Sequence, residues 1–304
     1  MTIGLFFDIG NTNAGRSLLK ELLSAGLPVR AFEVGTGWDT LDGTEYAAAF
    51  AELGQIVVVM GSKTLSRQWF SLLAGVGLGS EREFLLYEGN LTRSPEYPHY
   101  LSHAHRTRSS GELAKRLRTI HTYQRQQQRV EEAREQLVSL GYCLNENSFA
   151  GAVAEGNLEA VDLFLRTGMS PDSVDTEDLP MLNTAIRNVR ESVARLLVER
   201  GADVNVTSGD RSNTPLMEAA GRGMTALVKL FLERNAAVNL QSENGQTALM
   251  LAVSEGFEET ALLLLRHAAD PHAADKLGMS ARKYAELYRL VRVVEEIDKL
   301  PRQS

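Results

Sequence analysis

The sequence predicts two domains: an N-terminal α/β domain with a parallel sheet, and a C-terminal all-α solenoid of repeated helix pairs. Over residues 1–123, short apolar runs alternate with helical segments, a pattern typical of a parallel sheet with covering helices. Residues 124–146 are predicted to form a helical connector rich in Gln, Arg and Glu. From residue 147 to residue 301, two helical runs and a polar connection recur with a period of 33 or 34 residues.

The sheet is predicted from four apolar runs rich in β-branched and aromatic residues. These runs are IGLFFDI at 3–9, PVRAFEV at 28–34, QIVVVMG at 55–61 and REFLLYE at 82–88. Helices are expected between the runs at 14–26, 43–54 and 66–75, and a further helix at 111–123 that can continue through 125–141. Because connections between parallel strands are right-handed, the domain is expected to be flavodoxin-like in outline.

In the second half, each longer helical run ends at one equivalent position: Gly168, Gly201, Asn235 and Ala268. One helix pair cannot bury its own apolar face, so neighbouring pairs are expected to bury it for each other. Aligned by the period, four columns of residues are expected to form the core: Val161, Ala194, Val228 and Ala261; Leu163, Leu196, Leu230 and Leu263; Phe164, Leu197, Phe231 and Leu264; Leu165, Val198, Leu232 and Leu265.

The shorter helical runs carry the more specific motif. Thr214-Pro215-Leu216 and Thr247-Ala248-Leu249 open two of them, where Thr is a good helix cap and Pro suits the first turn. This unit resembles the ankyrin repeat, whose first helix begins Thr-Pro-Leu, although Met217 and Met250 stand where the family has His. Gly245 and Gly278 match the family's hairpin between repeats, where a positive φ is needed.

Two repeats depart from this pattern. In the repeat at 179–212, Leu179 is placed at the Thr position and Asn188 at a Gly position, and a connector with one extra residue (209–211) predicts a longer hairpin. The last unit, Ser280 to Ile297, is rich in charged residues, as expected of a terminal cap with a polar outer face. The sequence therefore predicts about four repeats and a C-terminal cap.

Ankyrin modules bind partners with their hairpin tips and first helices, so the resemblance implies a protein partner on the concave side. The positions expected there are Asn183, Arg187, Glu218, Arg222, Leu251 and Glu255, with Asp210, Arg211, Glu243 and Asn244 at the hairpin tips. Each of these alone is equally explained as a solvated side chain, so the prediction concerns the surface that they form together.

The N-terminal domain carries a second resemblance. Ala25-Gly26-Leu27-Pro28-Val29 follows a Leu-rich helix, VVVMGS at 57–62 precedes KTLSRQW at 63–69, and Pro98 and Leu101 follow the fourth strand. This order resembles the TIR (Toll/interleukin-receptor) domain over about 120 residues. The resemblance implies a domain that mediates signalling or self-association, so that the whole chain would act as an adaptor or scaffold.

The same resemblance raises an alternative function. Some TIR domains cleave NAD with a Glu on the helix after the third strand, which implies an NAD-cleaving or nucleotide-binding effector regulated by its repeats. Leu73 stands at that position here, and a leucine cannot stabilise a developing oxocarbenium charge. Glu81 and Glu83 lie further along, near the fourth strand. We therefore predict no catalytic residue and no cofactor, with NAD only under the alternative.

Polar residues at strand ends are the remaining candidates for a site. Ligands of open α/β sheets bind at the carboxyl ends of the strands, so Asp8, Asn11 and Ser62 would line any pocket there. Helix capping explains Asn11 equally well. A small group at 99–105 contains three His residues, but a metal site needs more ligands, so we expect no metal.

Charge and composition narrow the class of protein. Residues 1–135 hold fifteen basic and fifteen acidic side chains, so the net charge of −7 comes from the repeat half, which argues against binding nucleic acid. No apolar run reaches about 18 residues, so no membrane span is expected. The opening MTIGLFFDIGN is predicted to be a strand and not a signal peptide. The single cysteine, Cys143, excludes an internal disulfide and favours a cytoplasmic location.

Overall fold

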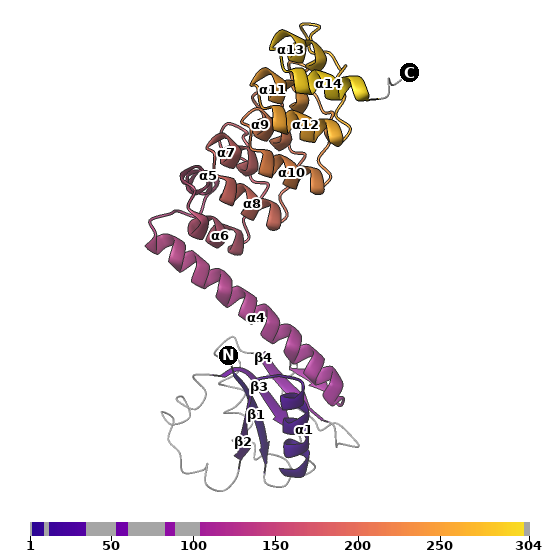
Figure 1. The fold of residues 1–304 in the computed structure, drawn as a ribbon. Helices are drawn as coiled ribbons and strands as arrows, with labels where there is room; N and C mark the ends of the chain where they lie inside the picture. Colours follow the sequence, from indigo (N-terminus) through magenta and orange to yellow (C-terminus); the bar gives the residue numbers. More distant parts are fainter. Residues whose placement is uncertain (1, 9–11, 35–52, 60–82, 89–103, 301–304) are drawn as a thin grey trace. The chain divides into compact units, whose positions relative to one another are not determined.

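The computed structural model describes residues 2–8, 12–34, 53–59, 83–88 and 104–300 (Figure 1). The chain divides into two compact units, Met1–Gln128 and Arg129–Ser304. We call the first the sheet unit and the second the repeat unit. The division falls inside one helix, α4 (Ser110–Ser139).

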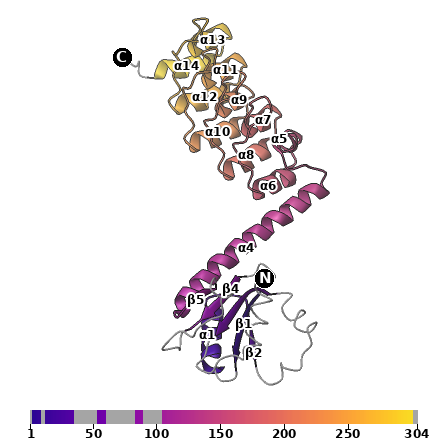
Figure 2. The ribbon, with the colours of Figure 1, turned by 180° about the vertical axis from the view of Figure 1, so that it is seen from behind.

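The sheet unit is built on a parallel sheet. Its described strands are β1 (Thr2–Asp8), β2 (Val29–Val34), β3 (Leu53–Val59), β4 (Glu83–Tyr87) and β5 (His105–Thr107), in the order β2-β1-β3-β4-β5 (Figures 1 and 2). Every described pair is parallel, which confirms the predicted parallel sheet. The short strand β5 was not predicted.

Two differences from the predicted elements follow. Leu53 and Gly54 were expected to end a helix, but they begin β3, where Leu53 pairs with Thr2 of β1 and Gly54 lies at an irregularity in the register. His105 was expected in a loop and begins β5 beside Leu85 of β4. The rest of the helix expected at 43–54, and the one at 66–75, lie outside the described residues.

Both faces of the central strand β1 are buried, as its nearly continuous apolar sequence requires. On one face, α1 (Thr12–Ser24) approaches closely at Gly15, where a Cβ atom would lie 2.2 Å from the Phe7 ring. On the other face, the Phe6 and Phe32 rings stack with centroids 4.6 Å apart. The core on the α1 side includes Ile3, Leu5, Phe7, Leu18, Leu22, Leu113 and Leu117.

Helix α4 contributes to two separate cores. Leu113, Ala114 and Leu117 are buried with the sheet, whereas Ala133 and Leu137 are buried with the first repeat. The residues between these two groups are mostly polar and largely exposed. The predicted continuation of the helix beyond residue 123 is therefore confirmed.

In the described part of the chain, five helix pairs form the repeat unit (Figures 1 and 2). The first helices of the pairs are α5 (Glu146–Glu155), α7 (Met181–Arg187), α9 (Pro215–Ala220), α11 (Ala248–Ser254) and α13 (Ala281–Leu287). The second helices are α6 (Leu158–Arg166), α8 (Glu191–Glu199), α10 (Thr225–Glu233), α12 (Glu258–Arg266) and α14 (Val291–Lys299). The fifth pair is the predicted terminal cap.

The predicted core columns are confirmed. All members of the first and third columns, such as Val228 and Phe231, are fully buried. Leu196, Leu230 and Leu263 of the second column are partly buried and pack against the same core. Each large buried side chain stabilises the stack by about 1.5–3 kcal/mol.

The first helices of the third and fourth repeats are capped as predicted, whereas that of the second repeat begins differently. Thr214 and Thr247 cap α9 and α11 by accepting hydrogen bonds from the backbone N–H groups of the third helical residues, 3.2 and 3.3 Å away. Helix α7 is instead preceded by Pro180 at the capping position, so the prediction that placed Leu179 there was wrong by one residue. The reason is that Leu179 belongs to the hairpin, where its N–H donates to the side chain of Asp175 at 3.0 Å.

The turn from first to second helix needs a positive φ in every repeat. Gly156, Gly223 and Gly256 provide it in the first, third and fourth repeats, and Arg289 in the fifth. In the second repeat the residue at this position is Val189, with φ 58°, and not Asn188 as predicted. The positions after the second helices also have positive φ, including Ala268 at 61°, as do the hairpin residues Gly245 and Gly278.

Val189 therefore occupies a strained backbone position. We expect Val189→Gly to raise the free energy of unfolding by about 1 kcal/mol, because a β-branched residue is disfavoured by about 1–2 kcal/mol at positive φ and Gly is not. The Val189 side chain is 65% exposed, so little burial is lost. Urea unfolding followed by circular dichroism measures the effect.

The matched control is Gly256→Val, which should destabilise by a similar amount, because nothing lies within 4 Å of a Cβ atom built there. A Val189→Gly variant no more stable than the original chain would contradict the assignment of strain to this residue.

Candidate partner-binding surface

Four hairpin turns project between successive helix pairs, and we call them fingers: residues 175–179, 208–213, 242–246 and 275–279. In the first and last fingers an Asp side chain closes the turn: Asp175 accepts from Glu177 and Leu179, and Asp275 accepts from Leu277 and Met279, at 2.8 to 3.0 Å. In the second and third fingers, Ser208 and Ser242 accept from the backbone N–H groups of Asn213 and Gln246, at 3.1 and 3.2 Å. Each finger is therefore braced by one of its own side chains.

The fingers are also joined to one another. The backbone N–H of Gly209 donates to Asp178 O at 3.1 Å, and that of Glu243 donates to Arg211 O at 2.9 Å. The third joint repeats this arrangement, with Lys276 N donating to Asn244 O at 3.0 Å. We call this row of bonds the finger ladder.

A charged network connects the second and third repeats. Arg187 at the end of α7 donates two hydrogen bonds to the carboxylate of Asp210 in the next finger, at 2.9 and 3.0 Å. It also donates two bonds to Oε1 of Glu218 on α9, at 2.8 and 3.0 Å. Oε2 of Glu218 accepts from Arg222 one turn further along. Two cations and two anions thus neutralise one another within the network.

Two of the predicted surface residues are buried. Glu218 is 4% exposed and Asn183 is fully buried, so the expectation that they are available to a partner was wrong. The physical reason is that each is used inside the stack. Glu218 holds Arg187 and Arg222, and the Asn183 amide donates to the Asn213 carbonyl of the next finger at 3.0 Å.

The other predicted residues differ in how far their side chains are exposed. Arg211, Glu243, Asn244 and Glu255 are exposed, and Leu251 is half-buried. Arg187 and Asp210 are partly accessible but hold each other. The exposed finger residues are therefore those best placed for contact with another protein.

The structure adds two residues that the sequence did not point to. The Asn213 side chain donates to Glu218 Oε1 at 3.1 Å, and the Asn213 backbone N–H donates to the buried hydroxyl of Ser208 at 3.1 Å. Both close the base of the longer second finger. A cue existed in the polar run 207–213, but nothing in it indicated which side chains turn inward.

The network makes stability depend on pH through Asp210. Hydrogen bonds from Arg187 hold the pKa of Asp210 well below its usual value, with burial opposing and Ser208 reinforcing the shift. The carboxylate therefore stabilises the fold above the unfolded-state pKa, about 4, and this contribution is lost as the pH falls toward the lower folded-state value. We expect Asp210→Asn to be less stable at neutral pH and the difference to shrink between about pH 5 and pH 2.

Urea unfolding of both chains across that range checks this prediction. Glu243→Gln, an exposed acid in the next finger, serves as the control and should show no comparable shrinkage. A stability difference for Asp210→Asn that stays constant with pH would contradict the role of Arg187.

The predicted strand-end residues are only partly described. Asp8 is the last residue of β1. Asn11 and Ser62, with Leu73, Glu81, His99 and His103, lie outside the described residues. Glu83 opens β4 at the amino end of the sheet, away from the carboxyl ends where ligands of such sheets bind.

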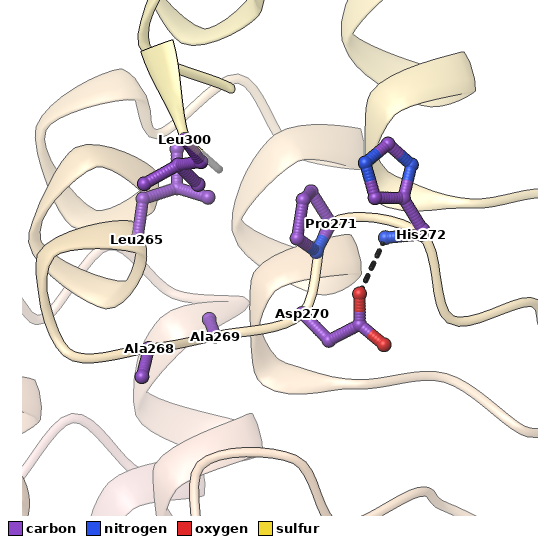
Figure 3. Close-up of a pocket in the computed structure, with 7 residues that line it drawn as sticks. All are labelled: Leu265, Ala268, Ala269, Asp270, Pro271, His272 and Leu300. Atoms are coloured by element: carbon purple, nitrogen blue, oxygen red, sulfur yellow. Dashed lines mark hydrogen bonds between the residues drawn. The ribbon is translucent and has the colours of Figure 1, made fainter. Parts of the chain in front are cut away.

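One pocket lies beside the base of the last finger (Figure 3). Its volume is about 500 Å³, and it is lined by Leu265, Ala268, Ala269, Asp270, Pro271, His272 and Leu300. One carboxylate oxygen of Asp270 already accepts from the His272 backbone N–H at 2.8 Å, and much of the remaining lining is apolar. This pocket lacks the converging titratable groups that catalysis requires.

Within the described ranges, no group of three or more His, Cys, Asp or Glu side chains is placed to hold a metal ion. In the same part of the chain, no helix combines the length and the apolar character needed to cross a membrane.

The stacked helix pairs, the capped first helices and the laddered fingers define the class of the protein as an ankyrin repeat solenoid. A family model described as ankyrin repeats (3 copies) matches residues 206–275. An ankyrin repeat-containing protein of Treponema pallidum (strain Nichols) is 30% identical over 289 residues, which are 95% of this chain and 96% of that protein. The chain belongs to this family of ankyrin repeat-containing proteins.

Two further relatives match the repeats over shorter stretches. Ankyrin repeat domain-containing protein 63 of Homo sapiens is 44% identical over 80 residues, or 25% of this chain and 21% of that protein. The 26S proteasome regulatory subunit p28 of Saccharomyces cerevisiae is 31% identical over 139 residues, or 44% of this chain and 60% of that subunit. Ankyrin repeats imply protein–protein interaction, so the general function of the chain is to bind other proteins.

Proposed function

We propose that this protein is a cytoplasmic adaptor that holds a protein partner on its fingers and first helices, while the sheet unit mediates signalling or self-association. The observation that carries the proposal is the braced row of fingers, whose tips expose polar side chains such as Arg211, Glu243 and Asn244. A preformed surface of this kind binds without paying the entropy of ordering loops. The proposal includes no cofactor.

Two observations support a separate contact role for the sheet unit, the first through the TIR resemblance. Its strand order, β2-β1-β3-β4-β5, is the order of flavodoxin-like sheets, which the TIR resemblance requires. The match to the Treponema protein spans 289 residues, more than the repeat unit contains, so the two proteins share sequence in the sheet unit as well. The presence of both units in the two proteins is what we expect of a scaffold with two contact surfaces.

Site-specific photocrosslinking in the cells that produce the protein tests the adaptor function. A benzoylphenylalanine residue at Arg211 or Glu243 should crosslink to a discrete protein partner. The same residue at Lys229, which is 67% exposed on α10 and away from the fingers, should not. Equal crosslinking at all three positions, or none at the fingers, would contradict the proposed surface.

One observation favours the alternative, an NAD-cleaving or nucleotide-binding effector. Glu88 follows β4 and is 3% exposed, and its backbone N–H donates to Thr107 O at the end of β5, at 2.8 Å. A buried carboxylate at the carboxyl end of a parallel sheet lies where ligands of such folds bind. Its partner Arg108 lies 3.6 Å away.

We expect incubation of the full chain with NAD to release no nicotinamide, because Leu73 replaces the acidic residue that the TIR resemblance requires. Chromatographic detection of nicotinamide over several hours measures this. Release that is abolished by Glu88→Gln, but kept by an exposed-site variant such as Glu243→Gln, would establish the enzymatic alternative instead.

A further inference from the structure

The finger ladder ends with a free acceptor. At each of the three joints, a carbonyl of one finger accepts an N–H from the next finger along the chain. In the last finger the equivalent carbonyl is that of Leu277, which stands where Asn244 stands in the finger before it. Among the described residues, no backbone or side-chain group donates to it. The ladder is thus complete at its inner joints and open at this edge.

The last repeat exposes large apolar side chains at its finger and at the end of its first helix. Leu277 at the finger tip is 84% exposed, and Leu287 and Tyr288 at the end of α13 are 64% and 50% exposed. The residues equivalent to Leu287 in earlier repeats face the following repeat: Arg187 bonds to Glu218, and a Cβ built at Gly221 would lie 3.5 Å from Leu251. Leu287 thus points where another segment would pack. We call Leu277, Leu287 and Tyr288 the terminal patch.

Contacts within the last repeat support Tyr288 and the finger that carries Leu277. Tyr284 donates a hydrogen bond to Asp275 at the base of the finger, at 2.8 Å, and its ring stacks on Tyr288 with centroids 6.3 Å apart. The Lys283 ammonium donates to Gly278 O at 2.8 Å, which ties the finger to α13. Rigid aromatic anchors of this type are enriched at the centres of protein interfaces.

The charge around the terminal patch is positive, in contrast to the acidic chain as a whole. Lys276, Lys283 and Arg289 are exposed beside it. The two acids of the same segment are already bound: Asp275 by Tyr284 and backbone N–H groups, and Glu286 by Arg282 at 3.0 Å. The charged residues of the first finger, by comparison, are all acidic.

We propose that the terminal patch binds an extended, acidic peptide segment of a partner protein. A backbone N–H of the peptide extends the finger ladder at Leu277 O, an aliphatic side chain packs on Leu287 and Tyr288, and acidic side chains pair with Lys276 and Lys283. This is strand addition to an open edge, in which main-chain bonds give affinity and side chains give specificity. The inference rests on the proposed partner-binding function and assigns that function a location and a peptide chemistry.

The test uses a library of random 12-residue peptides displayed on phage and panned over the full chain. We expect enrichment of peptides with at least two acidic residues around an aliphatic one. A synthetic consensus peptide should bind about tenfold more weakly to a Leu277→Ser/Leu287→Ser variant and to a Lys276→Glu/Lys283→Glu variant. These side chains are exposed, so the variants should fold, and thermal unfolding checks that they do.

Leu158→Ser, at a leucine 43% exposed in the first repeat, is the matched control and should bind the peptide normally. No enrichment, enriched peptides without acidic residues, or binding unaffected by both double variants would overturn the inference. A further outcome is that charge reversal of Arg211 and Glu243 abolishes peptide binding while the terminal variants retain it. In that case the adaptor function stands, and the assignment of the binding site to the terminal patch is wrong. Failure of the adaptor function would appear separately, as absent crosslinks at the fingers.

Discussion

Replacement of Glu218 by Ala is expected to lower the free energy of unfolding of the repeat unit by about 3–5 kcal/mol. The Glu218 side chain is 4% exposed and accepts hydrogen bonds from Arg187, Asn213 and Arg222. Its removal leaves Arg187 with Asp210 as its remaining carboxylate partner and leaves Arg222 and the Asn213 amide without this acceptor, in surroundings only partly open to water. Donors that lose their acceptor in such surroundings cost more than the original hydrogen bonds contribute. Urea unfolding of the full chain, followed by circular dichroism, measures the loss.

A double variant separates this desolvation effect from simple loss of packing. At the next joint, Gly221 and Leu251 occupy the positions of Arg187 and Glu218 and pack without charges. Arg187→Ala/Glu218→Leu should therefore recover most of the stability, while the exposed edge of Asp210 stays hydrated. If the double variant is as unstable as Glu218→Ala, the network contributes to stability in a way that burial of charge does not explain.

Replacement of Phe231 by Ala is expected to cost about 3–5 kcal/mol, the usual range for a large buried side chain. Phe231 on α10 is fully buried in the column it shares with Phe164, Leu197 and Leu264. Because repeats stabilise one another through nearest neighbours, the loss should be concentrated in α8, α10 and α12. Hydrogen–deuterium exchange read by mass spectrometry should show faster exchange in these helices and unchanged exchange in β1 and β3.

The control for this prediction is Leu240→Ala. Leu240 is 40% exposed between the third and fourth repeats, and its truncation should change stability by no more than about 0.5 kcal/mol. Exchange that accelerates equally in the sheet unit would show that the two units unfold together, contrary to the nearest-neighbour expectation.

The repeat architecture could be predicted from the sequence because the same pattern of apolar residues recurs in every repeat. A column such as Val161, Ala194, Val228 and Ala261 leaves little freedom in the alignment. The error at Pro180 arose where the motif lacks its Thr and only the hairpin bond from Leu179 to Asp175 fixes the register. Strand β5 was missed for a simpler reason: His105–Thr107 is three residues long and carries no apolar run.

The candidate surface was harder to predict than the fold. A position on the first helix indicates which side a residue faces, and Glu218 does lie beside the fingers. Its burial depends on Arg187, which is 31 residues away in sequence and reaches across from the previous repeat. One cue was present: the equivalent residues in the second, fourth and fifth repeats are Thr184, Leu251 and Tyr284, so Glu218 is the one acid at this position. The sequence could not show that this acid was enclosed by two arginines.

The uninterrupted course of α4 has a practical consequence for dissecting the protein. A helix cut at its middle leaves four carbonyl groups without donors on one fragment and four N–H groups without acceptors on the other. Since Leu117 anchors one half of α4 and Leu137 the other, a gene truncation near Gln128 should yield two fragments that each fray at the new end. Fragments that overlap across residues 110–139 would keep each anchor within a complete helix, and they are the sounder starting point for studying either half alone.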